Sequence, residues 1–268
     1  MRVLIMADME GVSGIVTWEQ VGHRGSMYQE GRRLYTEEIN AAVRGALAAG
    51  ATEIVAVDCH GAGGDESFNS FIPELLHPQV EWVAHHPWSR YTELLEQGCD
   101  AAVMVGMHAR NNTPDGVLCH TISTVQWRNL YFGDDLVGET GINAAQCGHY
   151  DCPVAVVTGD EAVVREVRET LGDGFTGIAV KRGLSRFSAR QIAPVRAREM
   201  IEAGTKKALQ DLGGLKLYKP GGTITIEIDT VDQVNTFRGR HGVEIVGPLK
   251  VVSRADDWMS SWNQVWNW

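Results

Sequence analysis

The chain has few cysteines and few basic residues for its size. Its five cysteines form an odd set with no C-x-x-C spacing, which argues against a disulfide framework and against a thiolate zinc site. Lys and Arg number 24 against 34 Asp and Glu, which gives a net charge of -10. Because phosphate contacts need a clustered basic surface, we expect no nucleic-acid partner.

The sequence also lacks the usual signals for membranes and nucleotides. No stretch approaches the roughly 20 apolar residues that a membrane span requires, so we expect no membrane partner. The chain begins with a strand-like segment and not with a cleavable apolar leader, which predicts a cytoplasmic protein. The glycine-rich segment 61–65 has no phosphate-loop pattern and no helix directly after it, which disfavours nucleotide binding.

What the sequence does contain is a series of short, continuous apolar runs rich in Val and Ile. Such runs are typical of buried strands in a parallel sheet, and segments with helical spacing lie between them. The alternation predicts an α/β fold, with a mostly parallel sheet layered with helices in a Rossmann-like topology. The expected strands cover residues 2–8, 54–57, 80–84, 101–105, 116–124, 129–132 and 154–157, and the expected helices cover 32–49, 89–96, 138–148 and 160–171.

The pattern changes after residue 190. A longer helix over 194–212, an alternating strand over 223–228 and an apolar strand region over 243–252 predict a smaller α+β region. We therefore expect a catalytic α/β domain at 1–190 and a second unit at 191–268. The tail carries Trp258, Trp262, Trp266 and Trp268, the first three at a spacing of four residues. This spacing favours a helix facing the core, and a subunit contact is the alternative.

Carboxylate and imidazole side chains follow three of the expected strands. Asp8 and Glu10 come after the first strand, His60 after the second, and His108 after the run at 101–105. In open α/β sheets ligands bind at the carboxyl ends of the strands, so these four side chains should meet at one edge. Two carboxylates held together need a proton or a cation between them. Nitrogen and oxygen donors without thiolate suit a catalytic zinc, manganese or cobalt ion.

Each of these residues has a simpler explanation when it is taken alone. A single histidine at a strand end is more often a hydrogen-bonded structural residue than a ligand. Glu139 adds a carboxylate at the start of an expected helix, where a favourable interaction with the helix dipole would also explain it. Only the convergence of several such residues favours a metal centre.

Five blocks of the sequence resemble the zinc-dependent D-aminopeptidases of the DppA family. They are residues 7–14 (ADMEGVSG), 58–60 (DCH), 106–110 (GMHAR), 116–121 (GVLCHT) and 137–144 (VGETGINA), and a sixth similarity covers 180–186 (VKRGLSR). Beyond residue 200 the similarity is one of length and texture only. Family members often have Ser where this chain has Met6 or Cys119. Met6 lies in the first expected strand and should not reach the metals, whereas Cys119 neighbours His120, so the detailed surroundings of His120 differ.

The resemblance implies a two-zinc centre and a peptidase activity. Asp8, Glu10, His60, His108 and Glu139 correspond to the five zinc ligands, with Asp8 as the bridging residue, and His120 corresponds to the catalytic residue described as a nucleophile. The family hydrolyses short peptides with a D-configured first residue, notably D-Ala. Its members assemble into homodecameric rings made of two pentamers. We therefore expect two zinc ions per subunit, a short peptide as substrate and self-association into a ring.

The chemistry of such a centre leaves some roles open. Two metals about 3.5–4 Å apart can share a water, lower its pKa and polarise a carbonyl. An imidazole titrates near neutral pH, so His120 is favoured as a general acid or base, with the nucleophile as the alternative. Arg110 either stabilises an oxyanion or a peptide carboxylate, or forms an ion pair with an acidic side chain.

Two other functions compete with the binuclear zinc aminopeptidase. The first is a metal-dependent hydrolase of another amide or of a phosphoester, which would call for Arg or Lys clamps around the metals. The second is a non-enzymatic peptide-binding protein, for which five metal ligands would be unnecessary.

Overall fold

The computed structural model describes residues 1–64, 67–85 and 91–266. The helices are α1 (Trp18–Val21), α2 (Tyr28–Ala48), α3 (Glu93–Glu96), α4 (Glu139–His149), α5 (Glu161–Leu171), α6 (Pro194–Gln210), α7 (Val231–Asn235) and α8 (Trp258–Val265), with a 3-10 turn η2 (Pro73–Leu75). The strands are β1 (Arg2–Ala7), β2 (Glu53–Asp58), β3 (Glu81–Val83), β4 (Ala101–Met107), β5 (Trp127–Phe132), β6 (Asp135–Val137), β7 (Val154–Asp160), β8 (Thr176–Ser185), β9 (Ser188–Gln191), β10 (Thr223–Ile228), β11 (Val243–Gly247) and β12 (Lys250–Arg254).

The larger sheet confirms the predicted α/β class. Its strand order is β3-β2-β1-β4-β7-β8-β9, and every pairing is parallel except that of β8 with β9. The first six strands follow the doubly wound order, in which the chain leaves β1 in both directions. The switch point lies between β1 and β4, and the crevice outside their carboxyl ends is the expected place for a ligand.

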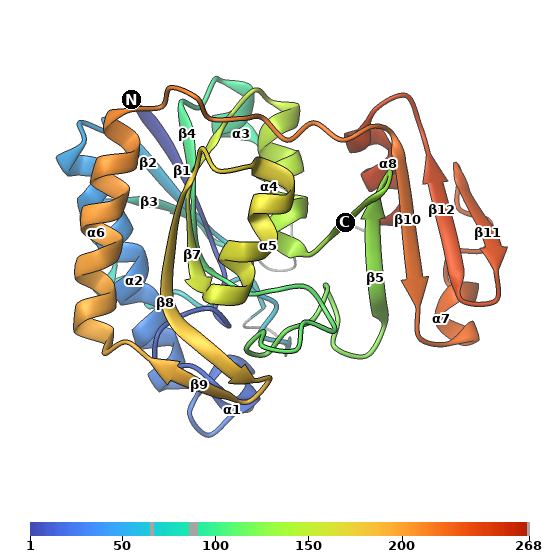
Figure 1. The fold of residues 1–268 in the computed structure, drawn as a ribbon, viewed down its shortest axis with the longest axis horizontal. Helices are drawn as coiled ribbons and strands as arrows, with labels where there is room; N and C mark the ends of the chain where they lie inside the picture. Colours follow the sequence, from blue (N-terminus) through green and yellow to red (C-terminus); the bar gives the residue numbers. More distant parts are fainter. Residues whose placement is uncertain (65–66, 86–90, 267–268) are drawn as a thin grey trace.

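Helices cover both faces of this sheet, as Figure 1 shows. Because successive side chains of a strand point to opposite faces, Val3 and Ile5 of β1 pack in the hydrophobic cluster with α2 and α6. Leu4 and Met6 belong instead to the cluster that contains residues of α4 and α5. This second cluster also contains apolar residues of the smaller sheet. Helix α4 lies between the two sheets, as Figure 1 shows, and its apolar residues belong to the same cluster.

The smaller sheet is antiparallel, in the order β11-β12-β10-β5-β6. Its strands come from two distant parts of the chain, because β5 and β6 precede residue 190 while the other three follow it. Conversely, α6 follows residue 190 but packs on the larger sheet, in the same hydrophobic cluster as α2. The expected boundary at residue 190 therefore does not separate the sheets, and the division into 1–190 and 191–268 as folding units stays a prediction.

Several expected elements differ in the structure. The expected strand at 116–124 is wrong, since this segment is a loop in which Leu118 and Ile122 have φ of 52° and 61°. The apolar region 243–252 is a hairpin of β11 and β12 and not one strand, because Pro248 has no N–H for a sheet ladder. Strands β8 and β9 were not expected, as their glycines and basic residues hide the strand pattern.

The other expected segments are present with shifted ends. The expected helix at 89–96 is described only from residue 91 and contains α3 near its end, while residues 89–90 lie outside the described ranges, as does Trp268. The helix expected at 32–49 begins earlier, at Tyr28, and the predicted stop at Gly50 adopts a φ of 92°. None of the described helices is long and apolar enough to cross a membrane.

Candidate metal centre

Three neighbouring strands of the larger sheet deliver the predicted ligands to its carboxyl edge. Asp8 directly follows β1, His108 directly follows β4, and His60 lies two residues beyond β2. Because β1 lies between β2 and β4 and all three run parallel, the three side chains emerge side by side at the switch point. They are almost completely buried, as is Glu10.

Asp8 lies at the middle of the group and contacts two histidines. Its Oδ1 is 3.1 Å from Nδ1 of His60, and its Oδ2 is 3.4 Å from Nε2 of His108. Glu10 lies on the His60 side, with Oε2 3.1 Å from Nδ1 of that ring. The two oxygen atoms of one carboxylate thus face imidazoles on opposite sides.

Glu139 completes the group from the other side. It is the first residue of α4, and its Oε1 lies 3.4 Å from Nε2 of both His108 and His120. The same oxygen accepts a hydrogen bond of 2.8 Å from the backbone N–H of Ile122. Glu139 therefore contacts two histidines in addition to beginning the helix.

The backbone fixes which nitrogen of each histidine faces the carboxylates. His60 Nε2 lies 2.8 Å from the carbonyl oxygen of Val21, and the Nδ1 atoms of His108 and His120 lie 3.0 and 2.9 Å from those of Ala109 and Leu118. A carbonyl accepts only from a protonated nitrogen, so a neutral ring presents a bare nitrogen to the carboxylates. Such carbonyl contacts commonly orient metal-binding histidines.

This arrangement fits a divalent metal. Bare nitrogens and carboxylate oxygens are all acceptors, so a cation or a proton must lie between them. Among the described residues, Glu10 Oε2 and His108 Nε2 are buried and have ionic contacts at 3.1 and 3.4 Å but no hydrogen bond of good geometry. Potential ligand atoms lie within 4.8 Å of one another in two sets of three, one from Asp8, Glu10 and His108 and one from His108, His120 and Glu139. Nitrogen with oxygen and no thiolate suits zinc in a catalytic site.

The electrostatics of the group point the same way. Burial, followed by the charge of Glu10, raises the pKa of Asp8 to about 7. Burial alone would also raise the pKa of Glu10, but the charge and hydrogen bond of His60 hold it well below its ordinary value. Burial alone would lower the pKa of His60, but the nearby carboxylates of Glu10 and Asp8 raise it well above the usual range. The carboxylates and imidazoles of this group therefore perturb one another strongly, as ionisable groups in functional sites commonly do.

His120 lies in the loop that replaces the expected strand. Its ring stacks on that of His108, with centroids 4.2 Å apart and an angle of 11°, and meets the edge of Trp18 at 5.6 Å. Burial and the charge of His108 lower its pKa. The positive φ of Leu118 and Ile122 is unusual for such residues and costs backbone energy, which is common where a functional group must be held in place.

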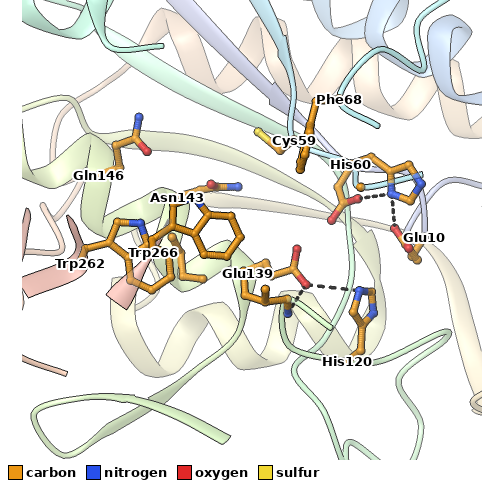
Figure 2. A pocket seen from close by; sticks show the side chains of 14 residues that line it. Glu10, Cys59, His60, Phe68, His120, Glu139, Asn143, Gln146, Trp262 and Trp266 are labelled. Atoms are coloured by element: carbon orange, nitrogen blue, oxygen red, sulfur yellow. Dashed lines mark hydrogen bonds and ion pairs between the residues drawn. The ribbon is translucent and has the colours of Figure 1, made fainter. Parts of the chain in front are cut away.

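A pocket of about 110 Å³ opens beside the carboxylates and histidines (Figure 2). We call it the aromatic pocket, and its walls beyond the candidate ligands are formed by Cys59, Gly61, Phe68, Ile122, Ile142, Asn143, Gln146, Trp262 and Trp266. The sequence reasoning missed these residues. For Asn143 and Gln146 a signal existed, since they follow Glu139 by four and seven residues on one helix face.

Trp258 and Trp262 are buried, which confirms the expected core-facing helix.

Arg110 points away from this group. Its Nη1 lies 2.8 Å from Oε2 of Glu169 and 3.2 Å from the carbonyl oxygen of Leu136. It does not line the aromatic pocket or the second pocket beside His60 and His120. Of the two alternatives drawn from the sequence, the ion pair is the one that the structure contains.

Comparisons with known proteins give consistent matches along nearly the whole chain. The sequence profile of the peptidase family M55, described as D-aminopeptidase, matches residues 1–266. The D-aminopeptidase of Bacillus subtilis (strain 168) is 32% identical over 269 residues, covering 98% of this chain and 94% of the relative.

A solved structure matches as well. It is that of the Zn-dependent D-aminopeptidase DppA from Bacillus subtilis, described as a self-compartmentalizing protease. The TM-score is 0.90 at 30% identity, over 98% of this chain and 95% of the other. With sequence profile, relative and fold in agreement over both sheets, the chain belongs to the D-aminopeptidase family M55 and is an enzyme of the metallo-aminopeptidase type.

Proposed function

We propose that the protein is a binuclear zinc aminopeptidase that removes the first residue from short peptides, with a D-configured residue such as D-Ala at that position. The observation that carries the proposal is Asp8, whose two oxygens face the imidazoles of His60 and His108 at 3.1 and 3.4 Å. A carboxylate placed in this way suits a bridge between two cations. The relatives, a D-aminopeptidase and a Zn-dependent D-aminopeptidase, support the same activity.

The ligand assignment follows from these contacts. Glu10 and His60 would hold one zinc ion, His108 and Glu139 the other, and Asp8 both. Zinc bound by these residues would supply a Lewis acid for the scissile carbonyl and would lower the pKa of a water. The α-amino group of the substrate, in its neutral form, could bind one of the zinc ions through its lone pair, which would favour cleavage of the first residue.

His120 would move the proton. The contact of its Nδ1 with the Leu118 carbonyl leaves Nε2 directed toward Glu139 and the aromatic pocket. Its lowered pKa keeps the ring neutral near pH 7, so Nε2 can accept a proton from the attacking water and return it to the leaving amine. The nucleophile role described for the family is the alternative, and a covalent acyl intermediate on His120 during turnover would decide for it.

The surroundings disfavour the phosphoester alternative. Among the described residues that line the two pockets at this centre, none is Arg or Lys, so a phosphate group would lack the cationic clamps that usually bind it. The peptide-binding alternative without catalysis leaves the buried group of carboxylates and histidines unexplained.

Self-association is the remaining part of the proposal. Because the related DppA is a self-compartmentalizing protease, we propose that this chain also forms a ring, a homodecamer, around its active sites. Sedimentation of the zinc-loaded protein would show a single species of ten chains. The cytoplasmic location stays a prediction from the sequence.

His120→Ala tests the catalytic assignment. We expect zinc-loaded wild-type protein to cleave D-Ala p-nitroanilide, and the variant to lose about 10²-fold or more in kcat/KM, the lower range for general acid–base catalysis. Its zinc content should remain equal to that of wild type. Because His120 also belongs to a potential ligand set with His108 and Glu139, a fall in zinc content would instead make it a ligand. Full activity would remove it from the mechanism.

A further inference from the structure

The aromatic pocket has a polar end and an apolar end. Asp8, Glu10, His60, Glu139 and His120 form the polar end, whereas Trp262 and Trp266 lie on the side away from Glu10 and His60, and Phe68, Ile122 and Ile142 complete the apolar lining. Figure 2 shows the two indole rings beside the amides of Asn143 and Gln146, on the side away from Glu10 and His60. A molecule held at the carboxylates would therefore direct one of its groups toward an apolar wall.

The indole rings of this wall pack against one another. Trp262 stacks on Trp266 with centroids 5.5 Å apart and an angle of 11°, and on Trp258 at 5.8 Å and 8°. Trp127 meets the edges of Trp262 and Trp266 at 6.2 and 6.3 Å. Stacked and edge-to-face contacts of this kind fix the orientation of aromatic rings. The indoles can then receive an apolar group without having to be ordered by it.

The neighbouring space is of a different kind. The second pocket shares Glu10, His60, Gly61, His120 and Ile122 with the aromatic pocket. Its other walls are Trp18, Val21, Gly22, Ser123 and Thr124, and it is the larger of the two at about 330 Å³. A peptide with its scissile bond at the carboxylates thus has a roomier path, of mixed polarity, for the leaving part. The apolar end remains for the side chain of the first residue.

We propose that the aromatic pocket binds the side chain of the first residue, and that Trp262 and Trp266 select a large apolar side chain of leucine or phenylalanine size. This inference rests on the proposed aminopeptidase activity and changes its expected preference, since a D-Ala methyl group would leave the indole wall largely in contact with water. A large side chain would cover that surface, which is the favourable direction for apolar groups.

The test compares p-nitroanilides of D-Ala, D-Leu and D-Phe on the zinc-loaded protein. One methylene in a hydrophobic pocket changes kcat/KM by about 10- to 200-fold. We therefore expect the better of the D-Leu and D-Phe substrates to exceed D-Ala by at least about tenfold. Trp266→Ala should lower the ratio of the D-Phe to the D-Ala value by at least about tenfold, and Trp266→Phe should lower it less.

The controls separate specificity from folding and from the reaction. Trp82→Ala removes an indole that is 42% exposed on β3 and lines neither pocket at the centre, and it should leave all three rates unchanged. Preference for D-Ala by tenfold or more in wild type, or an equal change of every rate in Trp266→Ala, would overturn the inference. If no anilide were cleaved, the proposed function would fail instead.

Binding provides a second readout that needs no turnover. We expect calorimetry on the zinc-loaded protein to show D-phenylalanine binding at least about tenfold more tightly than D-alanine, by the same range for a buried methylene. Trp266→Ala should reduce this difference. Equal affinities in wild type would contradict the inference, even if all the anilides were poor substrates.

Discussion

Replacing Asp8 with asparagine is expected to remove catalysis almost completely. Asparagine keeps the shape of the side chain, but it puts an uncharged amide between His60 and His108, where a carboxylate oxygen faces each ring at 3.1 and 3.4 Å. An amide group is a poorer zinc ligand than a carboxylate, and losing the bridge would affect both cations. We expect kcat/KM for D-peptide anilides to fall by about 10⁴-fold or more and zinc content to drop below one per subunit, because metal chemistry supplies most of the rate in such a site.

The same substitution should not destabilise the metal-free protein. Burial and the charge of Glu10 raise the pKa of Asp8 from 3.8 to about 7. Because the folded state holds the proton of Asp8 more tightly than the unfolded state does, the protonated carboxyl group favours folding at low pH. This contribution is lost as the pH rises through the folded-state pKa of about 7. At pH 8 the ionised Asp8 therefore disfavours the folded state, and Asp8→Asn removes that cost.

Two measurements check this prediction. Zinc content by mass spectrometry, with anilide hydrolysis, should separate Asp8→Asn from the control Asp134→Asn, which changes an exposed carboxylate in the turn after β5. Thermal unfolding in a chelator at pH 8 should give a Tm for Asp8→Asn at or above that of wild type. An Asp8→Asn protein with two zinc ions and normal activity would refute the bridging role.

The location of the site could be predicted from the sequence because it depends on strand ends. Asp8 and His108 follow apolar runs, and a parallel sheet places the ends of such runs at one edge. The pairing of β1 with both β2 and β4 then brings His60 into the same group. The position of Glu139 followed from its place at the start of a helix with a recognisable sequence block.

The shape of the pocket could not be predicted in the same way. The loop at 116–124 contains apolar residues that suggest a strand, and only its long-range contacts impose the left-handed backbone at Leu118 and Ile122. Leu118 donates its N–H to the carbonyl of Arg186, and Ile122 donates to Glu139. These partners lie 68 and 17 residues away in the sequence. Local propensity carries no information about such contacts.

The role of the tryptophans shows the same limit. Their spacing on a helix correctly indicated a face toward the core. The spacing gave no sign that α8 would pack beside α4. That contact depends on the smaller sheet, in which β5 and β6 belong with β10, β11 and β12 from a distant part of the sequence. Trp262 and Trp266 reach the pocket only because α8 packs on that antiparallel sheet, so the sequence pattern could suggest burial but not a substrate wall.

Lys181 holds the loop that carries Glu10, and its replacement by methionine is expected to be strongly destabilising. Its side chain is 2% exposed, and Nζ donates to the carbonyl oxygens of Glu10, Val12 and Ile15 at 2.6, 2.8 and 2.7 Å. Methionine has similar length but no donor, so the Glu10 carbonyl would lose its donor, while the Val12 and Ile15 carbonyls would keep only the longer bonds from Ile15 N–H and Gln191 Nε2 at 3.2 and 3.4 Å. Each unsatisfied buried group costs about 1–3 kcal/mol.

One opposing effect reduces this cost. Burial lowers the pKa of Lys181 to about 8, so the protein spends free energy to keep the ammonium group charged at pH 7, and methionine would recover it. However, the buried acids Glu38 and Asp160 lie near this ammonium and favour its charge, and they would lose their cation. Removing one member of a buried charged group typically costs about 3–5 kcal/mol, and we expect a net loss of stability in that range.

The effect of Lys181→Met should extend to the metal centre. If the loop at residues 10–15 shifts, Glu10 no longer meets His60 at 3.1 Å, and zinc affinity should fall by about 10- to 100-fold, as it does when groups supporting a ligand are lost. Urea unfolding and zinc titration of Lys181→Met, beside the exposed control Lys207→Met on α6, measure both quantities. The control should match wild type in each. A Lys181→Met protein with unchanged stability and zinc affinity would show that the three carbonyls find other partners, and that Glu10 is positioned by β1 alone.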